Sequence, residues 1–418
     1  MHTSLRSFAA AASLVLLAGC GVSNAVGHQM FGLDDSSSAA PGATPTVFGY
    51  AVADEPQAAI AARQILNQGG NAADAAAAAG FAQAVTLPSR GGLGGGGACL
   101  VKMFDSSGKA QPPVALLFPA GAPGGGSGDR PAAVPTLARG LFALQARFGV
   151  LPSAAVIVPA ERLAASAELS PALEYDLQTV GPALLADPAA AAVFAPNGGL
   201  LPANANLVQP DLAATLEVLR TQGLPGFYAG SFAQSFTTAA DAAGGGLTLS
   251  DLANGAPQFT NPDISTAGAY NVASLPVATS PFEELPASAA FMALDKNGGS
   301  VICVTSMNNL FGTGRIAAGT GVLLAASPRT NPTPDLAAAM AYVSGNLNFR
   351  AAASGTGQSA AAQAAQIAIT NALSKTQSPI PSPGRANIIS CPGNVPGGEA
   401  TCTATADPQG QGLAIGGR

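Results

Sequence analysis

The apolar residues fall at helical spacing in several parts of the chain. Ala75 to Val85 is apolar almost without interruption and follows Asn71, which predicts a buried helix that begins with an asparagine cap. Residues 132–185 are also expected to be helical, because apolar side chains recur there every three or four positions, at Leu141, Leu144, Phe148 and Leu151. Another helical stretch is expected at 211–219, with a further helix soon after it.

Shorter apolar runs predict strands. One run covers residues 98–104. Two more, at 290–294 and 301–305, are separated by a turn with two glycines and therefore predict a β-hairpin. Ser288 lies just before the first strand of this hairpin.

Two later regions carry other signals. After Asn254 we expect irregular structure, because prolines recur at positions 257, 262, 276, 281 and 286. From Pro334 we expect a helix, then a loop of small residues at 353–359, then an Ala-rich helix from Ala360. Strands mixed with buried, Ala-rich helices are typical of layered α/β packing.

A glycine-rich segment, residues 91–97, connects the first helix to its strand. Phosphate-binding loops run in the order strand, glycines, helix, and a lysine closes them. Here the order is reversed and the lysine is missing. The segment therefore favours close backbone packing at the start of a strand over nucleotide binding.

The first 46 residues have the composition of an export signal followed by a tether. Arg6, an apolar run and the sequence Leu-Ala-Gly before Cys20 are typical of a lipoprotein signal, in which residues 1–19 are removed and Cys20 carries the lipid. The alternative is a plain secretory signal, and both imply export. Gly21 after the cysteine favours an anchor in the outer membrane, facing the periplasm. Residues 20–46 are small and polar and predict a flexible tether.

Composition limits what the remaining chain can do. It is 48% hydrophobic and 10% charged, so residues 47–418 can bury a large core. The net charge is −6 and the 17 basic residues form no stripe, which argues against a nucleic-acid partner. The two histidines, His2 and His28, both lie at the very start. A Ser-His-Asp or Cys-His mechanism is therefore excluded for the folded part of the chain.

Four cysteines follow Cys20. Cys391 and Cys402 bracket a loop rich in proline and glycine, which predicts a disulfide in an oxidising compartment. Cys99 and Cys303 lie in apolar, strand-like runs and are expected to be buried thiols. Without a nearby histidine or a CxxC pair, we expect no zinc or other metal site, and no cofactor is implied.

Several motifs, taken in order, resemble the gamma-glutamyltranspeptidase family. In the first part of the chain they are GGNAADA at 69–75, the glycines of 94–97, FYAG at 227–230 and LTLSDL at 247–252. The start of that family's small subunit is similar to LDKNG at 294–298, NNLFGTG at 308–314 and GTGVLL at 319–324. The resemblance covers most of residues 48–375, and together the motifs are specific.

The resemblance implies a fold and a processing event. The fold is that of the N-terminal-nucleophile hydrolases, an α/β (α+β) architecture in which four layers form an αββα sandwich. Family members are made as precursors that cut themselves. Residues 47–287 would then correspond to the large subunit and residues 288–418 to the small subunit, with the two fragments held together as a heterodimer.

The resemblance also assigns the nucleophile. Counting back without gaps from Asp295 places Ser288 where the family has the threonine that opens its small subunit. Serine supplies the hydroxyl that this chemistry needs. The cut would fall between Ala287 and Ser288, and the freed α-amino group of Ser288 would act as the base.

Four further residues take their roles from the same resemblance. Ser306 falls where the family has a threonine that hydrogen-bonds the nucleophile, and Asn308 falls where an asparagine contacts substrate. Thr356 and Gly357 fall on the pair whose backbone N–H groups form the oxyanion hole.

The chain departs from the family at three positions that recognise a free α-amino acid. Pro119 replaces the arginine that grips the substrate α-carboxylate. The acidic residue that binds the substrate amine in the family is expected shortly after Leu324, but the sequence there is AASPRT. A serine pair near Met340 is replaced by alanines. Losing these charge-assisted contacts would abolish ordinary glutathione recognition while leaving the hydroxyl nucleophile in place.

These observations predict a self-cleaving amidohydrolase or acyltransferase that is gamma-glutamyltransferase-like. Its substrates would be γ-glutamyl or related amides or peptides. The protein would be anchored to the cell envelope through Cys20. The alternative is a non-catalytic envelope lipoprotein that keeps the fold. In that case Ser288 is a linker serine, and Ser306 and Asn308 are polar residues that satisfy the backbone at a strand end.

Overall fold

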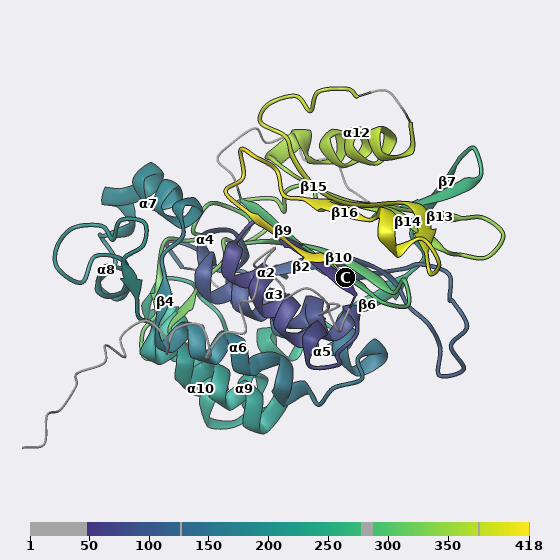
Figure 1. Cartoon of the computed structure of the whole chain (residues 1–418). Helices are drawn as coiled ribbons and strands as arrows, with labels where there is room; N and C mark the ends of the chain where they lie inside the picture. The colour runs from purple at the N-terminus through teal and green to yellow at the C-terminus, as the bar shows by residue number, and fades with distance from the viewer. Residues whose placement is uncertain (1–47, 126–127, 277–286, 375–376, 418) are drawn as a thin grey trace, which may run out of the picture. The chain divides into compact units, whose positions relative to one another are not determined.

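Two β-sheets stacked face to face form the centre of the protein, and helices cover the outer side of each (Figure 1). The computed structural model describes residues 48–125, 128–276, 287–374 and 377–417. The expected leader, the tether and Cys20 lie outside the described residues. The four-layer αββα arrangement predicted for the fold is confirmed.

The first sheet has seven antiparallel strands, and its order mixes early and late parts of the chain. From edge to edge the strands are β17 (Leu413–Gly417), β1 (Gly49–Ala53), β9 (Ser288–Asp295), β10 (Ser300–Ser306), β2 (Gly96–Lys102), β3 (Val114–Phe118) and β6 (Gln258–Thr260). The predicted hairpin is therefore confirmed as β9 and β10. Ser288 is the first residue of β9 rather than a residue before it.

The second sheet has six antiparallel strands. In order they are β16 (Thr403–Thr405), β15 (Arg385–Val395), β14 (Phe349–Thr356), β13 (Ala337–Val343), β8 (Tyr270–Ser274) and β7 (Asp263–Ala267). The core between the sheets is formed by side chains such as Leu100, Met292 and Ile302 from the first sheet and Met340 and Phe349 from the second. Burial of these side chains holds the two sheets together.

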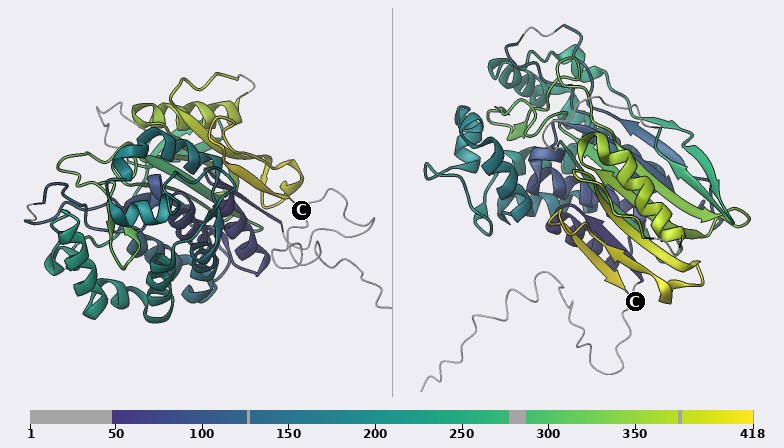
Figure 2. Two further views of the ribbon diagram at one scale, coloured as in Figure 1. Left: turned by 90° about the vertical axis from the view of Figure 1, so that its left-hand side faces the viewer. Right: turned by 90° about the horizontal axis from the view of Figure 1, so that it is seen from above.

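Helices cover the two outer faces unequally (Figure 2). A single helix, α12 (Ala361–Leu373), packs on the second sheet. The first sheet carries α2 (Pro56–Asn67), α3 (Ala72–Thr86) and α5 (Leu137–Phe148), with α6 (Ser153–Ala165), α9 (Pro210–Tyr228) and α10 (Gly230–Ala242) packed beyond them. The remaining elements are α4 (Pro88–Gly91), α7 (Pro171–Leu184), α8 (Pro188–Phe194), α11 (Leu249–Ala253), η1 (Gln358–Ala360), η2 (Glu399–Thr401) and two small hairpins, β4 (Ala167–Glu168) with β5 (Asn206–Leu207) and β11 (Ile316–Ala317) with β12 (Val322–Leu323). Within the described residues, no helix is long and apolar enough to cross a membrane.

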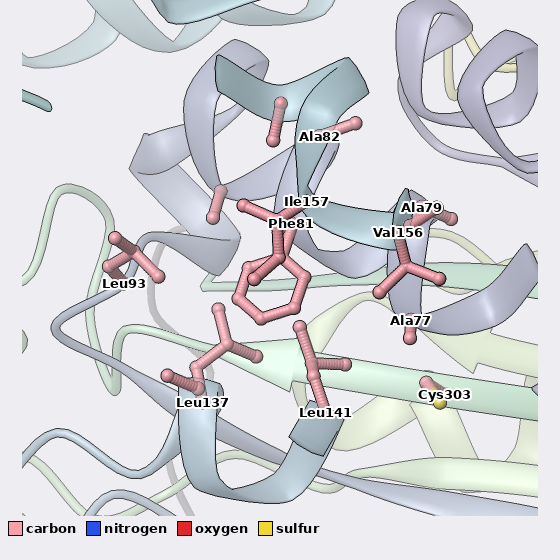
Figure 3. Close-up of a cluster of buried hydrophobic side chains, with 14 of the residues drawn as sticks. Ala77, Ala79, Phe81, Ala82, Leu93, Leu137, Leu141, Val156, Ile157 and Cys303 are labelled. Atoms are coloured by element: carbon pink, nitrogen blue, oxygen red, sulfur yellow. The ribbon is translucent and has the colours of Figure 1, made fainter. Parts of the chain in front are cut away.

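Helix α3 is buried along its whole length, as its apolar sequence predicts. It begins with a capping box, in which the Asn71 side chain accepts hydrogen bonds from backbone N–H groups and the Asp74 carboxylate accepts one from the Asn71 N–H. The helix lies between the first sheet and α6. Phe81 packs there beside Leu141 of α5 and Ile157 of α6 (Figure 3). Small alanines on the rest of its surface allow this close approach on all sides.

The glycine run performs the packing role predicted for it. A Cβ at Gly94 would lie 2.1 Å from the carbonyl oxygen of Leu323, and one at Gly95 would lie 2.3 Å from that of Ser306. At Gly97 the nearest atom would be the carbonyl oxygen of Val304, at 2.5 Å. Only glycine allows backbone to approach backbone this closely.

Two expectations for later segments are wrong. Residues 337–343 and 349–356 form β13 and β14, although the sequence AAAMAYV favours a helix from its alanine content. β13 is buried between β8 and β14, so sheet pairing overrides local propensity. The region after Asn254, expected to be irregular, contains β6, β7 and β8. Its described prolines lie beside these strands and not inside them, so they remove no hydrogen bond from the sheet.

One expectation for the cysteines is also wrong. Cys99 and Cys303 are not free thiols but form a disulfide, because β2 and β10 are antiparallel neighbours that place the two residues directly opposite each other. Their Cα atoms are 4.0 Å apart. The second disulfide joins Cys391 to Cys402, the pair expected from the sequence.

A buried ion pair joins α4 to α7. The Arg90 guanidinium donates two hydrogen bonds, of 2.8 and 2.6 Å, to the carboxylate of Asp176, which also accepts one from Ser89 Oγ. Both charged side chains are almost fully buried. Such a pair is held in place mainly by the cost of leaving either charge alone.

Replacing Asp176 with alanine is therefore expected to be strongly destabilising. The Asp176→Ala change leaves a buried guanidinium without its partner and should lower the free energy of unfolding by roughly 3 to 5 kcal/mol. The partly exposed pair Arg220–Glu161 provides the control, and Glu161→Ala should lower the free energy of unfolding by about 1 kcal/mol or less. Urea unfolding followed by circular dichroism measures both. Equal losses in the two variants would contradict the prediction.

Glu55 caps the start of α2 from a fully buried position. Its Oε2 accepts hydrogen bonds from the Ala58 N–H at 2.8 Å and from Thr86 Oγ1 at 2.7 Å. Its Oε1 is buried and has no hydrogen-bond partner among the described residues. Burial outweighs the two hydrogen bonds and raises the pKa of Glu55 from 4.5 to about 7.

This raised pKa predicts a stability that falls with pH. The folded protein binds the Glu55 proton more tightly than the unfolded chain, so the stabilisation is complete below pH 4.5 and is lost as the pH rises through about 7. Between pH 5 and 7.5 Glu55 should account for about 2 kcal/mol of lost stability. The Glu55→Gln variant, which cannot titrate, should lose less stability over this range than wild type in urea unfolding. The exposed Glu217→Gln should behave like wild type, and identical pH profiles for all three proteins would refute the assignment.

Candidate active site

The candidate nucleophile lies where the first sheet places two serines opposite each other. Ser288 begins β9 and Ser306 ends β10, and the two residues are direct partners in the antiparallel ladder. Both are buried. The pairing of β9 with β1 stops at Ala53, so Ser288 extends beyond the end of β1.

The peptide bond before Ser288 is held by two hydrogen bonds. The carbonyl oxygen of Ala287 accepts one from Ser306 Oγ at 2.7 Å and one from the Met307 N–H at 3.4 Å. Both donors point at the oxygen on which negative charge would develop if a nucleophile attacked this carbonyl. The carbonyl at the predicted cleavage point thus accepts two hydrogen bonds.

Asn308 completes this hydrogen-bonded chain. Its backbone N–H donates to Ser306 Oγ at 2.8 Å, and its Nδ2 donates to the carbonyl oxygen of Ala326 at 2.8 Å. Asn308 has a φ of +61°, a conformation that asparagine tolerates better than most residues. Its Oδ1 is buried and has no partner among the described residues, so it is free to accept a hydrogen bond from a ligand. The structure therefore brings Ala287, Ser306 and Asn308 together, and their roles stay predictions.

Thr356 and Gly357 come from the second sheet. Thr356 ends β14, and Gly357 follows with a φ of +104°. A Cβ at Gly357 would lie 2.2 Å from the carbonyl oxygen of Pro383, so the position requires glycine. Strand β14 packs against β9 and β10 across the core. Among the described residues no hydrogen bond joins this pair to Ser288, and their role as an oxyanion hole stays a prediction.

Several polar residues behind the nucleophile were missed in the sequence. Thr305 Oγ1 donates to the carbonyl oxygen of Ala289 and accepts from Gln83 Nε2. The carboxylate of Asp54 accepts from the Ala290 N–H at 2.8 Å and from Asn387 Nδ2 at 2.7 Å. Burial of Asp54 raises the pKa of its carboxyl group. Gln83 and Asp54 are polar residues in or beside apolar runs, which is the signal that could have revealed them.

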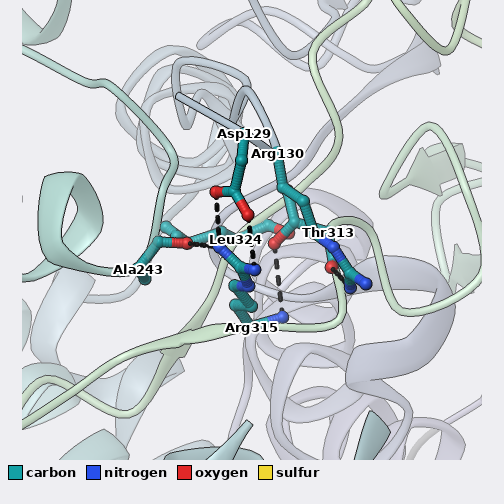
Figure 4. Close-up of polar contacts among 6 residues, drawn as sticks. All are labelled: Asp129, Arg130, Ala243, Thr313, Arg315 and Leu324. Carbon is teal, nitrogen blue, oxygen red and sulfur yellow. Dashed lines mark hydrogen bonds and ion pairs between the residues drawn. The ribbon is translucent and has the colours of Figure 1, made fainter. Parts of the chain in front are cut away.

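One of the segments expected to recognise a substrate amino acid lies beside this site. Residues 129–134 lie against residues 313–327, through hydrogen bonds that include Ala133 N–H to the Ala325 carbonyl oxygen. Figure 4 shows the ion pair that ties them together, in which Arg315 donates to both carboxylate oxygens of Asp129 at 2.7 and 2.8 Å. Ala326, whose carbonyl oxygen holds the Asn308 side chain, is part of the same contact.

The side chains in these segments are not those of an amino-acid site. Pro119 is exposed, and Ala325 and Ala326 are buried and apolar. Ala338 and Ala339 are buried in β13. Arg329 is the charged residue nearest in sequence to Ala326, and its charge is opposite to that of the acid expected there. Within the described residues, no group of three or more His, Cys, Asp or Glu side chains could hold a metal ion.

Comparisons with known proteins test the family resemblance. The family model for gamma-glutamyltranspeptidase matches residues 58–283. The acylase ACY 1 proenzyme of a Pseudomonas species is 31% identical over 251 residues, covering 54% of this chain and 44% of the relative. The glutathione hydrolase proenzyme of Escherichia coli is 31% identical over 232 residues, covering 51% and 39%. The chain spans less than half the length of these two relatives.

The fold extends the similarity over nearly the whole chain. The crystal structure of cephalosporin acylase from Bacillus halodurans superimposes with a TM-score of 0.71 and covers 92% of this chain and 99% of that one, at 18% identity. At 18% identity the match supports a shared fold and nothing further. Because the family model covers more than half of the sequence and the motifs follow in the same order, the chain belongs to the gamma-glutamyltranspeptidase family.

Proposed function

We propose that this protein is an N-terminal-nucleophile amidohydrolase or acyltransferase that cuts its own chain between Ala287 and Ser288. The observation that carries the proposal is the hydrogen bond from Ser306 Oγ to the Ala287 carbonyl oxygen, directly beside a serine hydroxyl. The word proenzyme in the names of both sequence relatives adds support.

The self-cleavage proceeds in two steps. Ser288 Oγ attacks the Ala287 carbonyl carbon, and the Ser306 hydroxyl and the Met307 N–H stabilise the oxyanion. The C–N bond breaks, the serine proton passes to the departing nitrogen, and an ester joins Ala287 to Ser288 Oγ. Water then hydrolyses the ester, which leaves a carboxylate on Ala287 and a free α-amino group on Ser288.

The same serine then acts on the substrate. Its free amine takes the Oγ proton as the oxygen attacks the substrate amide carbon, and passes it to the leaving amine. Water or an acceptor amine releases the acyl group from Oγ. Ser306 orients the hydroxyl, Asn308 Oδ1 accepts a hydrogen bond from the substrate, and the N–H groups of Thr356 and Gly357 stabilise the oxyanion.

The substrate is an amide whose acyl group has no free α-amino acid end. Support comes from the replaced contacts, since Pro119, Ala325 and Ala326 offer neither a cation for an α-carboxylate nor an acid for an ammonium group. A charged end group would lose water there without gaining a partner. Acylase and glutathione hydrolase names both occur among the relatives, so the family accommodates more than one substrate class.

We also propose that the protein is exported and held in the envelope by a lipid on Cys20, in the outer membrane facing the periplasm. The pattern before Cys20 supports this location. So do the two disulfides, because such bonds persist in oxidising compartments and are rare in the cytosol.

Self-cleavage predicts two fragments on a reducing denaturing gel. The smaller should begin at Ser288 in N-terminal sequencing, and Ser288→Ala should stay whole because it lacks the attacking oxygen. Ser306→Ala should cut about 100-fold more slowly, since one oxyanion donor is lost. Ser300→Ala, on the same strand but away from the carbonyl, is the control and should cut like wild type. An uncut wild-type chain would favour the non-catalytic lipoprotein.

The substrate argument predicts a preference between two chromogenic anilides. Butyryl anilide has the γ-glutamyl acyl chain without its α-amino and α-carboxylate groups. The processed protein should turn over γ-glutamyl anilide weakly or not at all, and the butyryl compound at least as fast. Release of the aniline measures both rates, with Ser288→Ala as the blank. Brisk turnover of the γ-glutamyl compound alone would refute the substrate argument while leaving the nucleophile intact.

A further inference from the structure

The disulfide between Cys99 and Cys303 crosses the proposed cleavage point in the sequence. Cys99 belongs to the fragment that ends at Ala287, here called the N-fragment, and Cys303 belongs to the fragment that begins at Ser288, the C-fragment. Cutting one peptide bond would therefore leave the two fragments joined. The other disulfide cannot join them, because Cys391 and Cys402 both lie in the C-fragment.

We propose that the processed protein is a covalently linked two-chain molecule, with Cys99–Cys303 as the link between its fragments. The proposal rests on the proposed self-cleavage. The new element is that a covalent bond, and not packing alone, holds the two fragments together. Within the described residues, this is the disulfide that pairs a cysteine of one fragment with a cysteine of the other.

The link lies on one of the boundaries between the fragments within the first sheet. In the order β17, β1, β9, β10, β2, β3, β6, strands β17, β9 and β10 come from the C-fragment and the others from the N-fragment. Within this sheet the fragments therefore meet at three ladders, β17–β1, β1–β9 and β10–β2. The disulfide spans the last of these.

At this boundary the link fixes the register of the strand that carries Ser306. Cys303 lies opposite Cys99, and three residues further along β10 Ser306 lies opposite Gly96 on one side and Ser288 on the other. A slip of one residue would turn each side chain to the other face of the sheet. A covalent bond between β10 and β2 prevents that slip after the chain is cut beside Ser288.

The position of the link also protects it. Both cysteines are fully buried, and their side chains belong to the core between the first sheet and its helices. Figure 3 shows Cys303 in this cluster with Phe81 and Leu141. Reductant reaches this bond only when the core opens. The link also keeps the fragments at a high effective concentration, whatever the dilution of the protein.

Paired denaturing gels test the proposal on exported, full-length protein whose free thiols are blocked before denaturation. With reductant, wild type should give two fragments, and without reductant it should give one species of full mass. Cys303→Ser should give two fragments in both gels. Cys391→Ser, which removes the disulfide inside the C-fragment, should behave like wild type. Two bands from wild type without reductant would overturn the link.

A second measurement keeps the link separate from the cleavage. Mass spectrometry of an unreduced digest should find a joined peptide pair that contains Cys99 and Cys303, whether or not the chain is cut. Free Cys99 and Cys303 thiols would overturn the proposal even if Cys303→Ser fails to accumulate. A single band with reductant, together with the joined peptides, would show that the disulfide exists but that self-cleavage fails, and the two-chain proposal would fall with it.

Discussion

The candidate site depends on how closely the backbone at the start of β2 approaches its neighbours. Gly94, Gly95 and Gly97 let β2 lie within van der Waals reach of the main chain at Leu323, Ser306 and Val304. A side chain at any of them would push β10 or the segment after Thr320 outwards. Ser306 would then no longer reach the Ala287 carbonyl oxygen, and the substrate-side segment would no longer lie beside Asn308. Backbone contact thus sets the geometry of the polar groups.

The site combines two features that usually occur together in this family but are separate here. The hydrogen-bonded chain from Asn308 through Ser306 to Ala287 lies where the proposed reaction would take place. The wall that would bind a free amino acid has apolar or oppositely charged residues. Reaction chemistry depends on a few short distances within β9 and β10, whereas recognition depends on separate segments. Substitutions in such segments can therefore alter recognition without altering the contacts between β9 and β10.

Much of this arrangement could be predicted from the sequence, for identifiable reasons. Helix α3 and the β9–β10 hairpin have strong local patterns, and the motifs around Asn308 follow a known order. Strands β13 and β14 could not be predicted, because their alanines favour a helix and only pairing with β8 and β15 makes them strands. The Cys99–Cys303 pairing was missed for the same reason, since 204 residues separate the two positions. Contacts between distant segments leave no local signal.

The mixed strand order of the first sheet also makes the two parts of the chain depend on each other. Neither fragment contains a contiguous half of that sheet, because β9 and β10 insert between β1 and β2. Strand β1 further needs β17, which is formed by the last described residues of the chain. Neither part can therefore complete the first sheet alone, whereas both donors to the Ala287 carbonyl come from the hairpin that carries Ser288. If the chain is cut there, each fragment without the other would leave strand edges unpaired at β1, β9 and β10.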